Sequence, residues 1–359
     1  MTSLRKLGTS DLEVFPLALG GNVFGWTADQ DRSFAVLDAY TAAGGNFVDT
    51  ADVYSAWVDG NQGGESETIL GAWLEARGNR SDVVVATKVS QHPDFQGLSA
   101  ANIKAAADAS LRRLRTDYID LYYTHFDQPD VPVEEIIGAL DDLVKSGKVR
   151  HIAASNITAE RLRASLAFSD REGLARYVAL QPHYNLVSRD TNEGELQELA
   201  ERAGLAAVPY YALASGFLTG KYRPGTEVES ARAGGAAKHL ETERGRRVLD
   251  ALDEVAGAHD APVATVALAW LAAQPTVAAP IASARTVEQL PALLGVGELT
   301  LSEAEIGRLT RALGLIRAAG FRTGFGSGVR SAFGSGVGAA TGAASGGDVG
   351  NGCKRLQER

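Results

Sequence analysis

Short apolar runs recur along the chain, and several of them close on a polar side chain. Apolar runs of about four to eight residues bounded by turn residues are typical of buried strands. The runs that share this property cover residues 46–49, 83–88, 118–125, 152–156, 178–181 and 205–210, and they end on Asp49, Lys88, His125, Asn156, Gln181 and Tyr210. We expect the polar ends of these strands to meet at one place and form a site.

Helical periodicity fills the intervals between these runs. Apolar positions spaced by three or four residues predict helices over about residues 65–76, 103–114, 133–146, 158–168, 191–203, 245–258 and 262–273. An earlier helix is expected to begin at Thr27–Gln30, which has the form of a capping box, and to stop at Gly44–Gly45.

The alternation of strand and helix predicts an α/β fold with a parallel sheet. There are about eight strand candidates, the last near residues 277–281, which favours a closed (β/α)8 TIM barrel over an open doubly wound sheet. No G-x-G-x-x-G sequence opens a helix after the first strand, so the usual dinucleotide fingerprint of open sheets is missing. A turn-forming cluster at residues 8–11 predicts an N-terminal β-hairpin before the first core strand.

Two segments depart from this alternation. Residues 216–246 are rich in Gly, Arg and Glu, and we expect a long functional loop there, at the face where barrel strands end. Residues 314–359 contain 13 of the 40 glycines and repeat Phe-Gly-Ser-Gly-Val at 325–329 and 333–337. Such a segment buries too little apolar surface to offset its ordering entropy. We therefore expect a barrel domain over residues 1–313 and a disordered Gly/Ala/Ser-rich tail over 314–359.

Charge and cysteine content narrow the class of protein. A net charge of -9 and a pI near 5.3 argue against a nucleic-acid or anionic-membrane partner. The one cysteine, Cys353, lies in the tail, which excludes disulfides and cysteine metal sites from the fold. The N-terminus has no apolar leader, and no apolar run approaches the roughly 18 residues of a membrane span. A cytoplasmic protein is expected.

The residues at the predicted strand ends suggest a proton donor. A tyrosine phenol has a pKa of about 10 and needs help to protonate anything at neutral pH. A neighbouring ammonium stabilises the phenolate, and a carboxylate beside the ammonium keeps it charged. Asp49 and Lys88 end two predicted strands, and Tyr54 lies in the loop after the first of them. Asp and Tyr at such places are often only turn and packing residues, but their convergence with Lys88 and His125 favours a tuned acid.

Other candidate residues stay more open. Trp26, Trp57 and Phe126 are expected in loops at the same face, where a substrate pocket and plain packing are equally compatible with them. His92 is expected to be a solvated loop residue. Metal binding by His125 and Asp49 is not expected, because no spacing such as H-E-x-x-H accompanies them.

Several ordered motifs give the chain a family resemblance. They are Gly45-Asn-Phe-Val-Asp-Thr-Ala-Asp-Val-Tyr54, Gly64-Glu-Ser-Glu-Thr-Ile-Leu-Gly71, Ala86-Thr-Lys88, Leu114-Arg-Thr-Asp-Tyr-Ile-Asp-Leu-Tyr-Tyr-Thr-His125, Gly147-Lys-Val-Arg150 with Ser155-Asn156, Gln181-Pro-His-Tyr-Asn185 and Gly216-Phe-Leu-Thr-Gly-Lys-Tyr222. With these motifs in this order over about residues 5–313, the chain resembles an aldo-keto reductase.

The resemblance implies an NADPH-dependent carbonyl reductase acting on a small-molecule aldehyde or ketone. It makes Tyr54 the general acid, Lys88 the modulator of its pKa, Asp49 the partner of Lys88, and His125 the group that orients the substrate carbonyl. It also implies NADPH bound across the barrel mouth without a Rossmann domain. The implied cofactor contacts are Ser155, Asn156 and Gln181 at the carboxamide, Tyr210 on the nicotinamide ring, Leu213, Ala214, Gly216 and Lys221 at the pyrophosphate, and Ser283, Arg285 and Gln289 at the adenosine end.

The chain departs from the family pattern at two places. It has Tyr210-Tyr-Ala-Leu213 where the family commonly has Tyr-Ser-Pro-Leu, which we expect to change the stiffness of that loop more than its role. It also has Pro291, Ala292 and Leu293 where many members carry an acidic residue and an Asn near the adenine. The second departure bears on cofactor affinity and on the preference for NADPH over NADH.

Two other functions fit the same barrel. Potassium-channel β-subunits resemble aldo-keto reductases and regulate a partner while holding the cofactor, but nothing here resembles their N-terminal inactivation segment. An aldolase would use Lys88 for a Schiff base, which a neighbouring Asp49 disfavours by keeping the lysine charged. The sequence names neither the substrate nor the oligomeric state.

Overall fold

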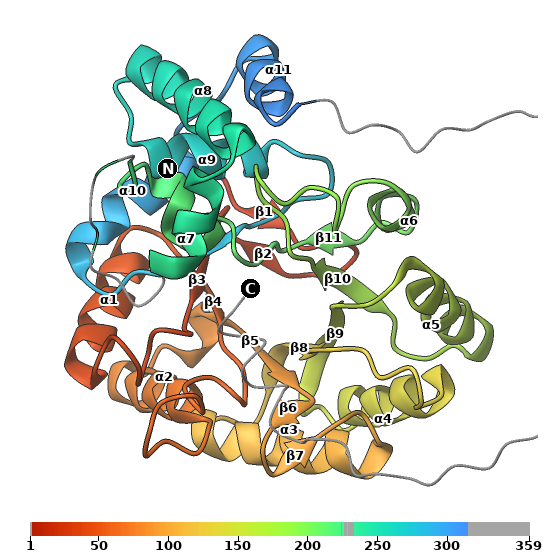
Figure 1. Ribbon diagram of the computed structural model, residues 1–359. Helices are drawn as coiled ribbons and strands as arrows, with labels where there is room; N and C mark the ends of the chain where they lie inside the picture. Colours follow the sequence, from red (N-terminus) through yellow and green to blue (C-terminus); the bar gives the residue numbers. More distant parts are fainter. Residues whose placement is uncertain (1, 224, 226–227, 229–232, 315–359) are drawn as a thin grey trace, which may run out of the picture. The chain divides into compact units, whose positions relative to one another are not determined.

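A ring of parallel strands forms the centre of the molecule. The computed structural model describes residues 2–223, 225, 228 and 233–314. The predicted tail from residue 315 onward, and part of the predicted 216–246 loop, lie outside the described residues. Within the described part, eight parallel strands pair in the order β11 (Ala206–Ala207), β10 (Tyr177–Gln181), β9 (Val149–Ser155), β8 (Ile119–Thr124), β5 (Val84–Val89), β4 (Phe47–Asp49), β3 (Ala18–Gly20) and β12 (Ile281–Ala282) (Figure 1).

The two ends of this sheet meet and close the barrel. β11 forms a parallel bridge through Ala207 to Val277, just before β12. The Ala207 amide donates to the Thr276 carbonyl at 2.8 Å, and the Ala278 amide donates to the Ala207 carbonyl at 2.9 Å. Because β12 also pairs with β3, every strand has a neighbour on both sides. The predicted (β/α)8 barrel is confirmed.

Strand alternation sorts the side chains into two cores. Phe47, Val84, Ala86, Leu121 and Tyr123 belong to the core inside the barrel, at every second position of their strands. The intervening residues, such as Val48, Val85 and Tyr122, pack outward into the larger core beneath the helices. By the same alternation Asp49 and Lys88 lie on the inward face of β4 and β5, and Thr87 lies on the outward face.

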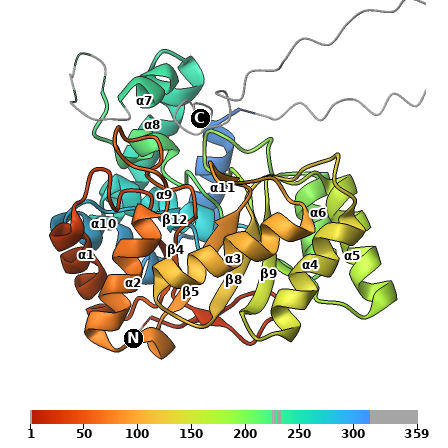
Figure 2. The same cartoon turned by 90° about the horizontal axis from the view of Figure 1, so that it is seen from below.

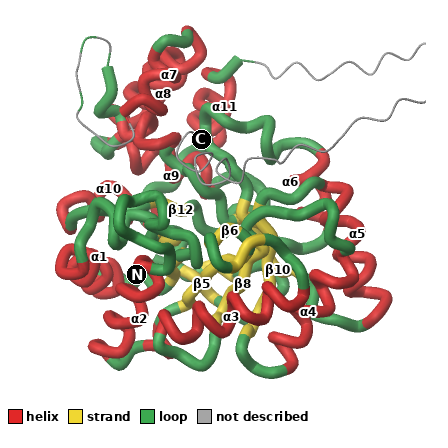
Figure 3. The backbone as a smooth tube through the Cα atoms, turned by 60° about the horizontal axis from the view of Figure 1, so that its bottom comes forward, coloured by secondary structure: helices red, strands yellow, loops and turns green. Residues whose placement is uncertain are grey.

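Helices cover the outside of the ring (Figures 1 and 3), and Figure 2 shows α2, α3 and α4 in front of the strands. They are α1 (Gln30–Ala42), α2 (Glu65–Arg77), α3 (Ala100–Leu114), α4 (Val133–Lys145), α5 (Ala159–Glu172), α6 (Glu195–Arg202), α7 (Ala233–Leu240), α8 (Glu243–His259), α9 (Val263–Ala272), α10 (Leu290–Leu294) and α11 (Glu303–Ala312), with 3-10 turns η1 (Arg80–Asp82), η2 (Ala214–Thr219), η3 (Val287–Gln289) and η4 (Gly295–Gly297). The helices expected from apolar spacing are confirmed, with ends shifted by a few residues.

No single described helix is long and apolar enough to cross a membrane; α8 and α9 reach that length and composition only as a pair bent by 99°.

The predicted hairpin is confirmed, and it plugs one end of the barrel. β1 (Arg5–Lys6) pairs antiparallel with β2 (Glu13–Val14), and Leu7, Leu12 and Val14 join the inner core. Gly8 in its turn has φ +60°, and a Cβ there would lie 2.1 Å from the Val178 carbonyl oxygen. Glycine at this position therefore lets the hairpin backbone approach the start of β10.

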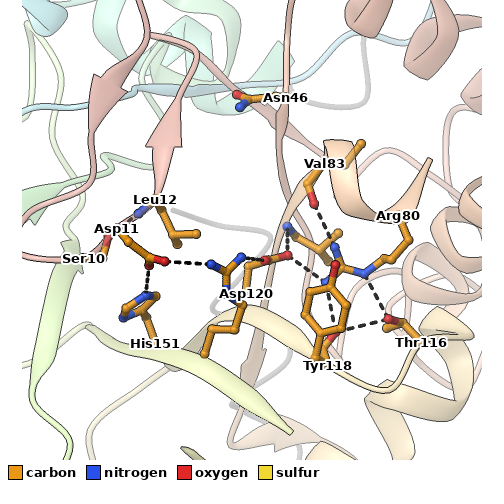
Figure 4. Close-up of polar contacts among 12 residues, drawn as sticks. Ser10, Asp11, Leu12, Asn46, Arg80, Val83, Thr116, Tyr118, Asp120 and His151 are labelled. Carbon is orange, nitrogen blue, oxygen red and sulfur yellow. Dashed lines mark hydrogen bonds and ion pairs between the residues drawn. The ribbon is translucent and has the colours of Figure 1, made fainter. Parts of the chain in front are cut away.

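A chain of ion pairs fastens the hairpin to the strands around it (Figure 4). Asp11 accepts from His151 at 2.6 Å and from Arg150 at 2.9 Å. Arg150 also donates to the buried Asp120 carboxylate at 3.0 Å, and Arg80 donates to the other oxygen of Asp120 at 2.7 Å. Asp120 thus links two arginines with the Val85 amide, which donates to it at 3.0 Å.

Two local predictions are wrong. The N-cap of α1 is Asp29, whose carboxylate accepts a hydrogen bond from the Arg32 amide at 3.0 Å. The Thr27 amide donates to the Val23 carbonyl within the preceding turn, so Thr27–Gln30 forms no capping box.

The 216–246 segment is also not all loop, because η2 and α7 lie in it. α7 contains two glycines, which lower helix propensity, so packing rather than propensity supports it: Ala236 is fully buried and His239 lies 5.0 Å from the Phe217 ring.

We expect Gly71→Ala to destabilise the protein by about 1–3 kcal/mol, because the contact between α2 and α3 leaves no room for a methyl group. A Cβ at Gly71 would lie 2.2 Å from the Arg113 carbonyl oxygen. Gly138→Ala in α4 is the matched control: a Cβ there meets nothing within 4 Å, so the change should stabilise by roughly 0.5–1 kcal/mol. Urea unfolding followed by circular dichroism measures both. Equal midpoints for Gly71→Ala and wild type would contradict the close approach.

Candidate active site

The Lys88 ammonium lies at the centre of a buried polar cluster at the carboxyl ends of the strands. Its Nζ donates to Asp49 Oδ2 at 2.7 Å, to the Thr50 carbonyl at 2.7 Å and to Tyr54 Oη at 2.8 Å. The side chains of Lys88 and Asp49 are 0% and 1% exposed. β4 and β5 are in register from Phe47↔Val84 to Asp49↔Ala86, which sets Asp49 beside the end of β5.

This geometry keeps the lysine charged despite its burial. Burial lowers the pKa of Lys88, and the nearby carboxylate of Asp49 opposes that shift. Two of the three partners, a carboxylate and a backbone carbonyl, can only accept, so they need N–H donors. With the phenol oxygen accepting the third N–H, the ammonium stabilises a negative charge on Tyr54. The phenol's own hydrogen bond to Asp49 Oδ2 is long, at 3.4 Å, so its proton is weakly held there.

His125 faces the same phenol as an uncharged imidazole. It follows β8 directly, is 5% exposed, and its ring centroid lies 6.2 Å from that of Tyr54. Burial, followed by the charge of Lys88, holds the pKa of His125 well below its ordinary value. The imidazole is therefore neutral at pH 7 and can donate a hydrogen bond without adding charge.

A line of hydrogen bonds connects Asp49 to the ends of the next strands. Gln181 Nε2 donates to Asp49 Oδ1 at 2.8 Å, and Ser155 Oγ donates to the Gln181 carbonyl at 2.8 Å. Asn156 Nδ2 donates to Ser155 Oγ at 3.0 Å, and Tyr210 Oη donates to Asn156 Oδ1 at 2.8 Å. The structure thus brings these four predicted cofactor residues together with the predicted catalytic group.

The remaining predicted cofactor residues lie in two loops. Leu213 caps η2, in which Ala214, Ser215 and Gly216 have φ of 47°, 56° and 93°, and a Cβ at Gly216 would lie 3.6 Å from Lys221 Cε. The loop after β12 carries the other three. Ser283 Oγ donates to Asn22 Oδ1 at 2.7 Å, and Gln289 Oε1 accepts from the Arg285 amide at 2.8 Å. A Cβ at Gly20, which pairs with Asp49, would lie 2.6 Å from Ser283 Oγ, so this loop borders the strand next to the Asp49–Lys88 cluster.

Aromatic rings continue outward from Tyr54 and His125. Trp57 packs edge-on against Tyr54 with centroids 6.1 Å apart, and Trp26 packs edge-on against Trp57 at 5.7 Å. Phe126 lies 5.2 Å from the His125 ring. All three flanking rings are partly exposed, so they continue the buried cluster outward and still present surface beside it.

The prediction for His92 is wrong. This side chain is 4% exposed, lies 5.3 Å from the Phe95 ring and accepts from the Asp94 amide at 3.1 Å. A small hairpin of β6 (Gln91–His92) and β7 (Phe95–Gln96) turns it inward, and strands of two residues leave no periodicity to detect. Sequence reasoning also missed Thr50, which acts through its carbonyl, and Asn22, the partner of Ser283. Within the described ranges, no group of three or more His, Cys, Asp and Glu side chains could hold a metal ion.

The neutral state of His125 predicts a loss of stability in mild acid. An unfolded imidazole has a pKa of about 6.5, and the folded one lies lower, so below that pH the unfolded chain binds a proton that the folded chain does not. The unfolding free energy should then fall, by up to about 1.4 kcal/mol per pH unit, as pH drops from about 6.5 toward the folded pKa. His125→Asn removes this contribution. Urea unfolding at several pH values between 7 and 5 measures the unfolding free energies of wild type and variant. The wild-type value should fall toward that of His125→Asn as the pH drops, and a difference that stays constant with pH would contradict the neutral imidazole.

Comparison with known proteins agrees with this fold. The Aldo/keto reductase family profile matches residues 16–313. Protein tas of Escherichia coli (strain K12) is 33% identical over 327 residues, which cover 83% of this chain and 94% of that protein. Norsolorinic acid reductase stcV of Emericella nidulans is 34% identical over 312 residues, covering 82% and 77%. Aryl-alcohol dehydrogenase [NADP(+)] of Phanerodontia chrysosporium is 32% identical over 321 residues, covering 82% and 81%. The chain belongs to the aldo/keto reductase family.

Proposed function

We propose that the protein reduces an aldehyde or ketone to an alcohol with NADPH, and that Tyr54 is the proton donor. One observation carries the proposal: Tyr54 Oη lies 2.8 Å from a fully buried ammonium, Lys88, which is itself 2.7 Å from the Asp49 carboxylate. Burying the ammonium and the carboxylate costs desolvation free energy. In return the ammonium stabilises the phenolate that remains when Tyr54 gives up its proton, and this makes the phenol a stronger general acid.

The residues present fit a nicotinamide dinucleotide. Amide and hydroxyl groups of Ser155, Asn156 and Gln181 would hold the carboxamide, and the Tyr210 ring would lie against the nicotinamide. Basic side chains in the two flanking loops, Lys221 and Arg285, suit phosphates, and the related fungal aryl-alcohol dehydrogenase carries NADP(+) in its name. When bound, the reduced cofactor supplies a hydride to the carbonyl carbon.

The chain's own groups act on the carbonyl oxygen. Tyr54 Oη and the neutral His125 imidazole hold the oxygen from two sides and polarise the carbonyl. As the carbon accepts the hydride, the oxygen becomes an alkoxide and takes the Tyr54 proton, which leaves a phenolate beside Lys88. Asp49 keeps Lys88 charged, and Gln181 holds the other oxygen of Asp49 at 2.8 Å.

The same contacts weigh against a Schiff-base role for Lys88. An amine attacks a carbonyl only through a free lone pair, and here Nζ is engaged with three oxygens at 2.7–2.8 Å in a side chain with 0% exposure.

The flanking rings favour aromatic carbonyl substrates. Trp57 packs against Tyr54 and Trp26 packs against Trp57, while Phe126 packs against His125. If the carbonyl of an aromatic substrate lay between Tyr54 and His125, the attached ring would contact these aromatic side chains. Benzaldehydes and aryl ketones are the first compounds to assay.

We expect Tyr54→Phe to lower kcat for carbonyl reduction by about 10²–10⁴, the usual contribution of general acid catalysis, with NADPH binding nearly unchanged. The ring stays and only the proton donor is lost. NADPH absorbance follows turnover, and cofactor fluorescence follows binding. Tyr118→Phe is the matched control, since that ring stacks under Arg80 at 3.9 Å, away from the cluster, and its loss of a hydroxyl should leave kcat unchanged. More than a tenth of wild-type kcat in Tyr54→Phe would sink the assignment.

We also expect NADPH to bind more tightly than NADH, with Arg285→Ala narrowing the gap by about 1.5–3 kcal/mol, the value of one charge-assisted phosphate contact. Arg308→Ala is the control, because that arginine is a surface residue of α11 paired with Glu254. Titration calorimetry with both cofactors gives the dissociation constants. Equal constants in the wild type would mean that no 2′-phosphate site exists.

A further inference from the structure

Asp52 is a fully buried acidic side chain that the proposed chemistry leaves unused. It lies in the turn after β4, three residues beyond Asp49, and is 0% exposed. Neither of its carboxyl oxygens has a hydrogen-bond partner among the described residues. The Val53 backbone amide favours the charged form of Asp52, but it donates no hydrogen bond to either carboxyl oxygen. Buried carboxylates normally accept several hydrogen bonds, so this one is exceptional.

The groups facing Asp52 lie on the elements around it. Glu67 comes from α2, and Arg113 from α3 donates to Glu67 Oε2 at 2.6 Å. Thr87, on the outward face of β5, donates to the other oxygen of Glu67. Lys88 is next to Thr87, and the Asp52 amide donates to the Lys88 carbonyl at 3.4 Å. Tyr122 of β8 lies in the same layer, fully buried, and the negative charges of Asp52 and Glu67 would oppose its ionisation. His92 packs beside the backbone of this turn, near Gly63.

Counting charges decides the state of Asp52. The buried Lys88 is paired with Asp49 at 2.7 Å, and the partly exposed Arg113 is paired with Glu67, so each of these cations already has an anion. An ionised Asp52 would have neither solvent nor a partner cation of its own. The free energy of removing that charge from water would then remain uncompensated. Burial first, and then repulsion from Glu67, raises the pKa of Asp52 well above its ordinary value.

We propose that Asp52 is an uncharged carboxylic acid in the folded protein, a positioning residue that leaves Asp49 as the partner anion of Lys88. The catalytic part of this inference rests on the proposed reductase function. Donation by Tyr54 places a new negative charge beside Lys88, and a second anion near that lysine would oppose it. A neutral Asp52 keeps Tyr54 an effective acid, and ionisation of Asp52 would weaken that acid.

Unfolding as a function of pH tests the charge state without any cofactor. Asp52→Asn replaces the acid with a neutral group of nearly the same size. Below about pH 3.9 the acid is protonated in both the folded and the unfolded chain, so it adds no pH dependence. Above that pH the unfolded wild type loses a proton that the folded one keeps, so wild-type stability falls relative to Asp52→Asn until the folded pKa is passed. The ratio of their unfolding equilibrium constants should change by up to about tenfold per pH unit in this window. A ratio independent of pH would overturn the proposal.

Infrared spectroscopy reads the proton directly. The difference spectrum of wild type minus Asp52→Asn at pH 7 should contain the C=O stretch of a protonated carboxylic acid. Asp38→Asn is the matched control, since Asp38 is a partly exposed partner of Arg77 and its difference spectrum should contain carboxylate bands. Carboxylate bands for Asp52 would refute the neutral acid. If Asp52→Asn does not fold, the assigned carboxyl ¹³C shift of Asp52 in the wild type decides instead: titration of that carboxyl between pH 3 and 5 would refute the neutral acid as well.

The pH profile of kcat tests the positioning role. At pH 7 Asp52→Asn should stay within about twofold of wild type, and at alkaline pH it should retain activity that wild type loses. A tenfold loss at pH 7 in a folded variant would mean that a charged Asp52 is required. Failure of the proposed function would appear separately, as a wild type that reduces no carbonyl compound or as an active Tyr54→Phe, with the unfolding and infrared results unaffected.

Discussion

The burial of one ammonium beside one carboxylate is the constraint on which the rest of the site depends. Moving the Lys88 charge out of water is costly, and only close, well-oriented acceptors offset that cost. Those acceptors come from the end of β4, from the next peptide carbonyl and from the loop that carries Tyr54, all within 2.8 Å. They converge only if β4 and β5 are neighbours in the observed register, because a shift by one residue would send Lys88 outward under the helices. The register of the barrel and the contact between the Lys88 ammonium and the Tyr54 phenol therefore depend on each other.

The sequence predicts those features that depend on residues close together in the chain, such as strands, helices and the polar residues at strand ends. The alternation of strands with helices is enough to predict the barrel, and the polar ends of the apolar runs are enough to place Asp49, Tyr54 and Lys88 at one face of it. The wrong predictions have a common cause: the local sequence allows more than one structure, and tertiary contacts determine which one forms. Thr27 and Asp29 are both good helix caps, and only the turn back to Val23 removes Thr27. His92 is buried by a hairpin too short to show a period, and α7 forms against η2 in spite of its glycines.

Asp49 and Asp52 show the same limit more sharply. They are identical side chains three residues apart, and nothing local distinguishes their roles. Asp49 ends a strand and lies on its inward face with Lys88, whereas Asp52 follows in a turn and faces the outer layer with Glu67 and Thr87. β5 separates the two layers, so neighbouring residues of one strand, Thr87 and Lys88, serve different carboxylates. Which acid carries the charge follows from this sidedness, which appears only when the strand is placed against its helices.

The contacts in the mouth also bear on how the proposed cofactor would gain its affinity. Asn156 donates to Ser155 and to the His125 carbonyl and accepts from Tyr210, and the side-chain oxygen of Gln289 holds the Arg285 amide. A carboxamide or adenine binding to these groups would exchange hydrogen bonds rather than add them, and an exchanged hydrogen bond has a net value of only about 0.5–1.5 kcal/mol. Most of the binding energy would then have to come from stacking on Tyr210 and from phosphates meeting cations. In the proposed complex the amides at the strand ends would therefore orient the nicotinamide, and Lys221 and Arg285 would contribute more of the affinity for the cofactor.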